Sequence, residues 1–346
     1  MFSFSEIQGR ENLFPFTLTR HTADLRTGMF SIREKWILAQ TIFPAIEAAG
    51  EIPANLIPGF DFFKAVSEQG LDHALSDLST YRIIQYPWDI VTHNTWALVE
   101  DFRMITQTGI SSPIPETIKL TGPAERLFIE EGAVVGHCFI NTETGPVHIG
   151  KQAEIMDGVM IRGPVSIGQA AVVKMGAAIY GGTSIGPFCI AGGELKNTVL
   201  FEYSNKAHHG YLGDAVIGAW CNLGAGTSCS NIRNTATPVK VWHIHQKAFV
   251  PAGLKCGLLM GDHSRCGINT SFNTGTVVGV SANIFQSGTL LPKYIPSFSW
   301  GTDGGIRYEI EKALADINNW MAFKNQRLSI SDIEKLTFIY SNTEQI

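Results

Sequence analysis

Two adjacent histidines, His208 and His209, stand directly before the segment GYLGDAVIGAWCNLGAG, which begins at Gly210. An imidazole accepts a proton readily at neutral pH, because the ordinary pKa of histidine is about 6.5. The pair is therefore a candidate general base. The alternative is that both histidines are loop residues without a chemical role.

The six cysteines offer no second chemical site. The sequence contains no C-x-x-C pair and no histidine at a metal-binding spacing from a cysteine. We therefore expect neither a bound metal nor a disulfide framework. Reduced, mostly buried thiols are the prediction.

Charge and hydropathy restrict the partners of the chain. A formal net charge of −5 leaves no basic surface of the kind that nucleic-acid phosphates require. The first residues contain no basic segment followed by an apolar core, and no apolar run approaches the length that spans a bilayer. We expect a cytoplasmic protein with no nucleic-acid or membrane partner.

A sixfold repeat predicts the architecture that must position the histidines. Aliphatic residues recur every sixth position, often followed by glycine, at Ile149, Ile155, Ile161, Ile167, Val173, Ile179 and Ile185. The period fails between Glu194 and Ala215, returns at Ile217 and Leu223, and resumes after a second break at Leu254, Met260, Cys266, Phe272, Val278 and Ile284. This period is typical of hexapeptide β-helices, in which three hexads close one triangular coil.

The fold class follows from this period. The pattern resembles that of left-handed parallel β-helices, whose coils stack about 4.8 Å apart. A β-sandwich would instead need alternating residues and turn signals every eight to twelve residues, which are absent. The 35 glycines and the charged content of 16% also favour β structure over long surface helices.

Two breaks in the repeat, residues 196–214 and 231–249, predict loops on one face of the β-helix. We expect three parts: a small α/β domain at 1–115, the β-helix at 116–291 and a helical extension at 292–346. Helices are predicted after Ser31, which forms a capping box with Glu34, and near Asp89 or Thr92 as alternative caps. At the end of the chain, Ile310, Leu314, Ile317 and Met321 share one helix face, and Ser331 with Glu334 predicts a further capping box.

Nearly the whole chain resembles one known family, the alternative bacterial branch of the bifunctional N-acetylglucosamine-1-phosphate uridylyltransferase and glucosamine-1-phosphate acetyltransferase family. The resemblance lies in NLFPFTLTRHTADLRTGMFSIREKW, IQYPWDI, IRGP, VKMGAAIYGGTSIGP, YSNKAHHGYLGD, MGDHSRCGINTSFNTGTVVGVSANIF and IPSFSWG. It is most specific in YLGDAVIGAWCNLGAGT, which is similar to the acetyltransferase active-site pattern. It implies a nucleotidyltransferase domain followed by an acyl-CoA-dependent, homotrimeric β-helix that serves UDP-N-acetylglucosamine biosynthesis.

The first domain is shorter than that family requires. Its segment TRHTADLRTGMFSIREKW keeps a degenerate signature, Arg20, Arg26, Gly28, Glu34 and Lys35, but lacks a glycine-rich phosphate loop. One glycine cannot cradle a triphosphate through successive backbone N–H groups. No paired carboxylates for Mg²⁺ are identifiable either. We predict a shortened nucleotidyltransferase-like domain without useful uridylyl transfer, so Mg²⁺ matters only if that domain is active.

The resemblance also implies roles in N-acetyl transfer. His208 matches the catalytic histidine, and Asn222 and Tyr211 match residues that orient it and hold the amine or acetyl group. Tyr211 could instead pack at a coil edge, and Asn222 could belong to a polar ladder inside the prism. The Ala225 N–H matches the donor to the thioester oxygen of acetyl-CoA, while Gly224 and Gly226 would let that ligand approach.

For the acceptor, the resemblance implies an amino-sugar phosphate such as glucosamine 1-phosphate. Lys174 and Lys196 match phosphate-binding positions, and Lys174 replaces an arginine, so the bidentate fork is lost. Asn231 and Lys240 match sugar contacts, although Ile232, Arg233 and Asn234 depart from the family pattern. Two alternatives stay open: a non-catalytic hexapeptide-repeat binding or assembly protein, and a residual sugar-1-phosphate nucleotidyltransferase.

Overall fold

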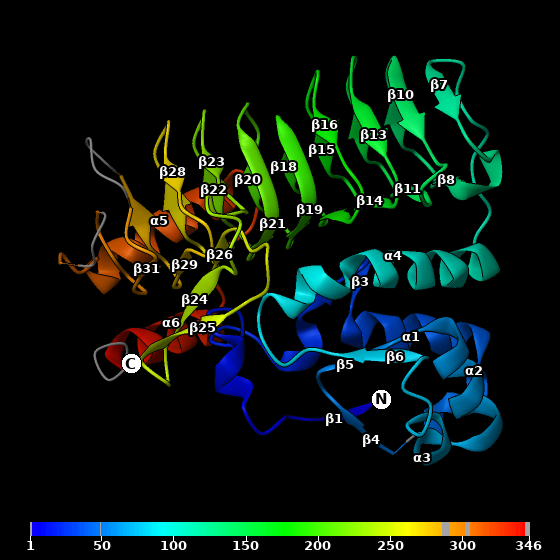
Figure 1. The fold of residues 1–346 in the computed structure, drawn as a ribbon, viewed down its shortest axis with the longest axis horizontal. Coiled ribbons are helices and arrows are strands. Elements are labelled where there is room, and N and C mark those ends of the chain that lie inside the picture. Colours follow the sequence, from blue (N-terminus) through cyan, green and yellow to red (C-terminus); the bar gives the residue numbers. More distant parts are fainter. Residues whose placement is uncertain (1, 49, 286–290, 302–304, 343–346) are drawn as a thin grey trace.

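The hexads form the coils of a parallel β-helix, which confirms the predicted fold class. The computed structural model describes residues 2–48, 50–285, 291–301 and 305–342. Figure 1 shows the β-helix as a row of strands, with the N-terminal helices along one side and the C-terminal helices at the far end.

Strands on the sides of the prism pair in parallel from coil to coil. One side contains β7 (Ile118–Thr121), β10 (Cys138–Asn141), β13 (Met160–Arg162), β16 (Ala178–Ile179), the first halves of β19 (Glu194–Leu200) and β21 (Tyr211–Ile217), and then β23 (Ser228–Cys229) and β28 (Ser271–Phe272). We call this side the tyrosine face. A second side, the asparagine face, contains β9 (Val134–Val135), β12 (Glu154–Ile155), β15 (Val172–Val173), β18 (Ile190–Ala191), β20 (Asn205–Lys206), β22 (Asn222–Leu223), β27 (Arg265–Cys266) and β30 (Asn283–Ile284).

The third side contains β8 (Leu127–Ile129), β11 (Val147–Ile149), β14 (Val165–Ile167), β17 (Thr183–Ile185), the second halves of β19 and β21, and then β26 (Leu259–Met260), β29 (Val277–Val278) and β31 (Tyr294–Ile295). The aliphatic residues of the first run of hexads, Ile149 to Ile185, are all buried in the prism. In the second run, Leu254 is wrong as a core position, because it lies outside the coils and is 61% exposed. The inward stack resumes only at Met260.

The first predicted loop, residues 196–214, is also wrong. This segment forms β19, β20 and β21 and continues the coils. Strands β19 and β21 bend around a corner of the prism without the usual break, so the buried residues Leu195 and Leu200 are five positions apart. The shortened side shifts the period of six and hides the repeat in the sequence.

The second predicted loop is confirmed. Residues 231–258 leave the coils and form an antiparallel hairpin of β24 (Lys240–His243) and β25 (Ala248–Pro251). Val239, Val241 and Ile244 of this hairpin region are buried in a core cluster shared with the N-terminal residues. His243 Nε2 lies 3.0 Å from Asn12 Oδ1. The hairpin therefore joins the β-helix to the start of the chain.

The N-terminal region combines small sheets with helices. Its strands are β1 (Ser3–Ser5), β2 (Arg26–Thr27), β3 (Phe30–Ser31), β4 (Glu51–Pro53), β5 (Leu56–Pro58) and β6 (Tyr81–Ile83), and its helices are α1 (Ile32–Ile42), α2 (Phe60–Gln69), α3 (Leu71–Ala74) and α4 (Asp89–Thr108). Helix α4 lies along the coils, and Asn94 Nδ2 donates to Gly182 O at 2.7 Å and to Ser184 Oγ at 2.9 Å. These bonds fix the helix against the β-helix.

The helix ends test the predicted caps. The Ser31–Glu34 capping box of α1 is confirmed. Neither Asp89 nor Thr92 caps α4, because Trp88 occupies the N-cap position and the Asp89 carboxylate accepts from the backbone N–H groups of Gln85 and Tyr86.

The chain ends in two helices, α5 (Ile310–Ala322) and α6 (Ile330–Asn342), which pack on the last coils through a separate cluster. Ile317 and Met321 are buried as predicted, while Ile310 and Leu314 are partly buried against the same cluster. The capping box before α6 is formed by Ser329 and Asp332 instead of Ser331 and Glu334. Within the described ranges, no helix has both the length and the apolar character that crossing a membrane requires.

Candidate functional site

The histidine pair lies on a turn at one corner of the prism. Strand β20 ends at Lys206 and β21 begins at Tyr211, so residues 207–210 connect the asparagine face to the tyrosine face. Both imidazoles are exposed. The turn therefore presents two candidate bases to solvent at the junction of two faces.

The next coil places Ala225 directly beside His208. Asn205 pairs with Asn222 across the two coils, and the Tyr211 N–H donates to Ser228 Oγ at 3.1 Å. Both contacts join residues 17 positions apart, and the same offset connects His208 with Ala225. Neighbouring coils are about 4.8 Å apart, so an imidazole and a backbone N–H share one corner.

Coil packing accounts for the glycines around Ala225. A Cβ at Gly224 would stand 2.5 Å from the Gly267 backbone. Gly226 has φ +76°, and a Cβ there would stand 2.2 Å from Asn269 Oδ1. The next coil requires these glycines, whether or not a ligand approaches them.

Tyr211 belongs to a hydrogen-bonded cluster that anchors the second loop. Asn231 Nδ2 donates to Tyr211 Oη at 3.0 Å and to Asp214 Oδ2 at 2.5 Å, and Asn197 Nδ2 donates to Asp214 Oδ1 at 2.7 Å. Burial, together with the charge of Asp214, raises the pKa of Tyr211 to about 12. The phenol stays protonated at neutral pH, and its proton remains available to a ligand because Oη acts as the acceptor toward Asn231.

Asp214 and Asn197 were not among the predicted site residues. Asp214 is buried, and its φ of +47° is in the left-handed region, which Asp tolerates better than most residues. The signal for Asp214 was present in the sequence as the last residue of YLGD.

The two candidate phosphate lysines lie near the histidine turn. Glu194 pairs with Tyr211 and Lys196 with Gly213, so Lys196 and Tyr211 lie on the same outer face of neighbouring strands. Lys174 lies two coils before the turn at the same corner. A Cβ at the intervening Gly192 would stand 3.3 Å from Lys174 Cβ and 2.4 Å from Ala207 O.

The structure does not bring Lys240 to the turn through any contact among the described residues. Lys240 is exposed on β24, and its carbonyl accepts from Lys293 Nζ at 3.2 Å. Asn222 lies on the outside of the prism, in a ladder with Asn205 and Arg265 on the asparagine face. The ladder proposed for Asn222 inside the prism is therefore wrong, because Leu223 takes the inward position.

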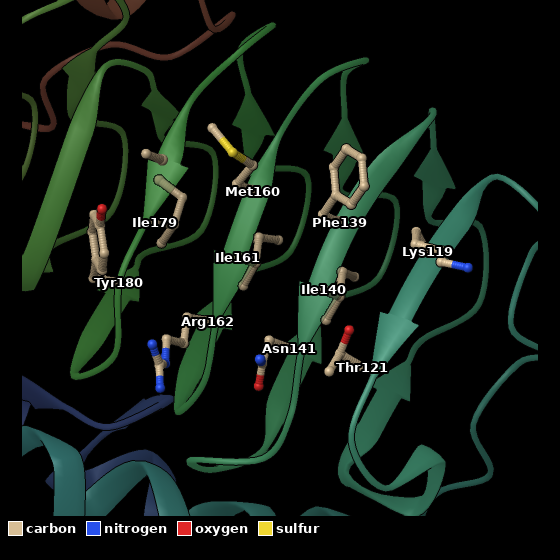
Figure 2. A pocket seen from close by; sticks show the side chains of 11 residues that line it. Lys119, Thr121, Phe139, Ile140, Asn141, Met160, Ile161, Arg162, Ile179 and Tyr180 are labelled. Atoms are coloured by element: carbon tan, nitrogen blue, oxygen red, sulfur yellow. The ribbon is translucent and has the colours of Figure 1, made fainter.

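A groove of about 430 Å³ lies on the tyrosine face, several coils before Tyr211. Figure 2 shows Phe139 and Met160 on neighbouring strands, with Asn141 and Arg162 farther along the same strands. Phe139 is 59% and Met160 is 49% exposed. The tyrosine face thus carries an apolar surface on coils that come earlier in the chain than the coils of the candidate site.

The signature residues of the first domain are engaged in internal contacts. Arg20 forms an ion pair with Asp262 of the β-helix, and Lys35 forms a buried pair with Asp101 of α4. Arg26 donates to Met29 O at 2.5 Å and to Glu34 at 3.0 Å. None of these cations lines a described cavity. Across the described parts of the chain, no group of three or more His, Cys, Asp or Glu side chains is placed to hold a metal ion.

Comparisons with known proteins find relatives among sugar nucleotidyltransferases and bifunctional GlmU proteins. Residues 2–43 match a family described as sugar nucleotidyl transferase. A protein named bifunctional protein GlmU from Methanococcus maripaludis is 31% identical over 247 residues, which cover 71% of this chain and 53% of that protein. A bifunctional sugar-1-phosphate nucleotidylyltransferase/acetyltransferase from Sulfurisphaera tokodaii is 37% identical over 95 residues, covering 28% of this chain and 23% of that protein.

Among solved structures, an Arabidopsis UDP-N-acetylglucosamine acyltransferase matches at 15% identity and a TM-score of 0.30, covering 67% of this chain and 91% of its own. The chain spans about half the length of the Methanococcus maripaludis relatives that it matches. The chain is therefore similar in sequence to proteins named bifunctional GlmU over about half of their length.

Proposed function

We propose that this protein transfers an acetyl group from acetyl-CoA to the amine of an amino-sugar phosphate, with glucosamine 1-phosphate as the first acceptor to test. The observation that carries the proposal is the exposed imidazole of His208 on a turn beside the backbone of Ala225, next to Tyr211. A relative named bifunctional GlmU, and another named a sugar-1-phosphate nucleotidylyltransferase/acetyltransferase, support the reaction class.

The residues of the turn can meet the needs of N-acetylation. The amine must lose a proton as the carbon–nitrogen bond forms, and His208 accepts that proton. Ala225 offers an N–H that has no acceptor among the described residues, so it can donate to the thioester oxygen as negative charge develops there. The thiolate of coenzyme A then leaves as the carbonyl re-forms. Acetyl-CoA supplies the acyl group, and Gly224 and Gly226 keep the coil surface beside Ala225 free of side chains.

The acceptor is oriented by groups around the turn. Tyr211 keeps a proton for a hydrogen bond to the sugar, and Asn231 is held beside it. Lys196 and Lys174 bind the phosphate as point charges. Asn222 orients the imidazole from the asparagine face, whereas Lys240, which no described contact brings to this turn, is given no role in the proposal.

Replacing His208 with alanine tests the assignment. We expect kcat to fall by about 10²- to 10⁴-fold, the usual contribution of a positioned base, while acetyl-CoA binding persists. His209→Ala is the matched control and leaves kcat nearly unchanged. Coenzyme A release is measured across a panel of amino-sugar phosphates. Wild-type turnover in His208→Ala, or a crippled His209→Ala variant, would reverse the assignment.

Lys196 makes a contact with the phosphate that substrate and transition state share. Lys196→Ala therefore raises KM for the acceptor and changes kcat little. A wild-type protein that binds amino-sugar phosphates but releases no coenzyme A would favour the binding or assembly alternative.

We propose that the first domain transfers no uridylyl group at a useful rate. The internal pairing of Arg20, Arg26 and Lys35 supports this proposal. The test is pyrophosphate release from UTP and a hexosamine 1-phosphate with Mg²⁺, and robust release contradicts it.

We further propose that the active form is a cytoplasmic homotrimer with sites between neighbouring prisms. The exposed apolar residues of the tyrosine face support an assembly of copies, and the six free, buried cysteines fit a reducing compartment. Light scattering at micromolar concentration tests the trimer, and a stable monomer would refute both the assembly and a shared site.

A further inference from the structure

A lysine occupies the interior of the prism directly below the histidine turn. Strand β20 turns Lys206 inward, where the neighbouring coils place Ala191 and Leu223. The Lys206 side chain is 1% exposed. A cation thus stands in a stack that is otherwise filled by aliphatic and small residues.

The Lys206 ammonium is bonded to two backbone carbonyls at the corner. Nζ donates to His208 O at 2.8 Å and to Gly192 O, on the preceding coil, at 3.2 Å. No carboxylate among the described residues pairs with Lys206. Burial lowers the pKa of Lys206 to about 8. A neutral amine has two N–H donors and an ammonium has three. The two carbonyl oxygens can therefore accept from Lys206 in either protonation state.

The carbonyl of His208 is enclosed from a second side. A Cβ at Gly193 would stand 2.8 Å from His208 O and 2.7 Å from Gly210 O. Gly193 has φ +73°, so only glycine is comfortable there. The preceding coil therefore leaves room for this carbonyl to point inward toward Lys206.

Stability alone does not explain this lysine. A buried ammonium without a carboxylate partner costs free energy that an apolar side chain of similar length avoids. Strongly perturbed buried groups concentrate at functional sites for this reason. The bond from Lys206 ends on the same residue whose imidazole is the candidate base.

We propose that Lys206 is a positioning residue that holds the His208 backbone from inside the prism and so fixes the direction of the imidazole. The inference rests on the proposed acetyl transfer at His208. Lys206 touches neither substrate, since its side chain is enclosed by the coils. Its loss acts on the chemical step through the turn and leaves substrate binding in place.

The test compares Lys206→Met with Leu223→Met. Methionine is unbranched like lysine and fills the stack without a donor, and Leu223→Met makes a packing change at the equivalent position of the next coil. In Lys206→Met we expect kcat to fall by about tenfold to 100-fold, the factor that one hydrogen bond to a charged group corresponds to. KM for both substrates stays within about twofold, because neither substrate loses a contact. Leu223→Met keeps the wild-type kcat.

Hydrogen exchange provides a readout that does not depend on activity. Amides of residues 207–210 exchange faster in Lys206→Met than in wild type, while those of residues 224–226 are unchanged. Unchanged exchange at the turn, or an unchanged kcat where His208→Ala is inactive, overturns the role of Lys206. If wild type releases no coenzyme A with any acceptor, the proposed function fails, and exchange alone decides whether Lys206 fixes the turn. Equal losses in Lys206→Met and Leu223→Met would make Lys206 a packing residue only and would also overturn the proposal.

Discussion

Replacing Asp262 with asparagine should weaken the joint between the start of the chain and the β-helix. Asp262 is 4% exposed, and its carboxylate accepts from Thr19 Oγ1 at 2.6 Å, from the Ala219 N–H at 2.8 Å and from Arg20. Asparagine keeps the shape of the side chain but removes the charge. Arg20 is then left buried, and its remaining ion-pair partner among the described residues is Glu202 at 3.7 Å.

The size of the effect follows from this geometry. Breaking one side of a buried ion pair costs about 3–5 kcal/mol of unfolding free energy, because the remaining charge is desolvated without compensation. The measurement is urea unfolding followed by tryptophan fluorescence at a fixed protein concentration, so that assembly contributes equally to both proteins. Asp61→Asn is the control, since the Arg103–Asp61 pair is exposed and contributes at most about 1 kcal/mol.

The pH dependence gives the same prediction a second test. Burial alone raises the pKa of the Asp262 carboxyl, but the charge and hydrogen bond of Arg20 bring the pKa below its usual range. The stabilisation is therefore present above the ordinary pKa of an aspartate and is lost as the pH falls through the lower folded value. The difference between wild type and Asp262→Asn stays constant from pH 5 to 8 and shrinks in stronger acid.

If Asp262→Asn does not fold, the test uses the double variant that carries Arg20→Met together with Asp262→Asn. Methionine removes the stranded charge, so the double variant recovers most of the loss. A loss below about 1 kcal/mol in Asp262→Asn, the value expected of an exposed pair, would refute the reasoning. So would a double variant less stable than the single one.

Three further predictions concern the coils and the first helix. The stability of wild type relative to Lys206→Met should rise by up to about 3 kcal/mol between pH 8 and 10.5, because in that window the unfolded wild-type chain binds a proton at Lys206 that the folded chain, with a pKa of about 8, has lost. Groups common to both proteins cancel in this difference, and a difference that does not change with pH in urea unfolding would contradict the prediction. The six free cysteines are buried, and burial raises the pKa of Cys189 to about 12, so none should react with a thiol reagent in native protein and all should react in denaturant; rapid native labelling is the contrary result. Ser31→Ala removes one half of the α1 capping box and should lower the unfolding free energy by about 1 kcal/mol in the same urea assay, whereas an unchanged value would show that the cap is replaced.

The sequence predicts the coils where every side of the prism has six residues. Between Leu195 and Ile217 the period is hidden, because β19 and β21 bend around a corner with five-residue spacings and because Lys206 takes an inward position. When inward residues are five positions apart and one of them is polar, the sequence alone suggests a loop. Only the pairing of neighbouring coils shows that this segment belongs to the β-helix.

The candidate site was predictable in its residues but not in its connections. The motif YLGD and its flanking histidines indicate the turn, and the structure places Tyr211 and Asn231 within hydrogen-bonding distance. Asn231 is 20 positions from Tyr211 and reaches it only because the coil returns to the same corner. No local pattern encodes such a return. The same limit explains why the internal partners of Arg20 and Lys35, which lie far away in the chain, were not foreseen.

The joint between Arg20 and Asp262 has a consequence for synthesis of the protein. The two residues are 242 positions apart, so the N-terminal segment cannot bury Arg20 until the ribosome has added those residues. At 5–20 residues per second, this takes on the order of 10–50 s. During that time Leu13, Phe14 and Phe16, which end in the core cluster shared with the coils and the hairpin, have no partner from the β-helix. The nascent chain therefore carries an unprotected apolar start, and a chaperone that binds such segments would act on this protein before its coils close.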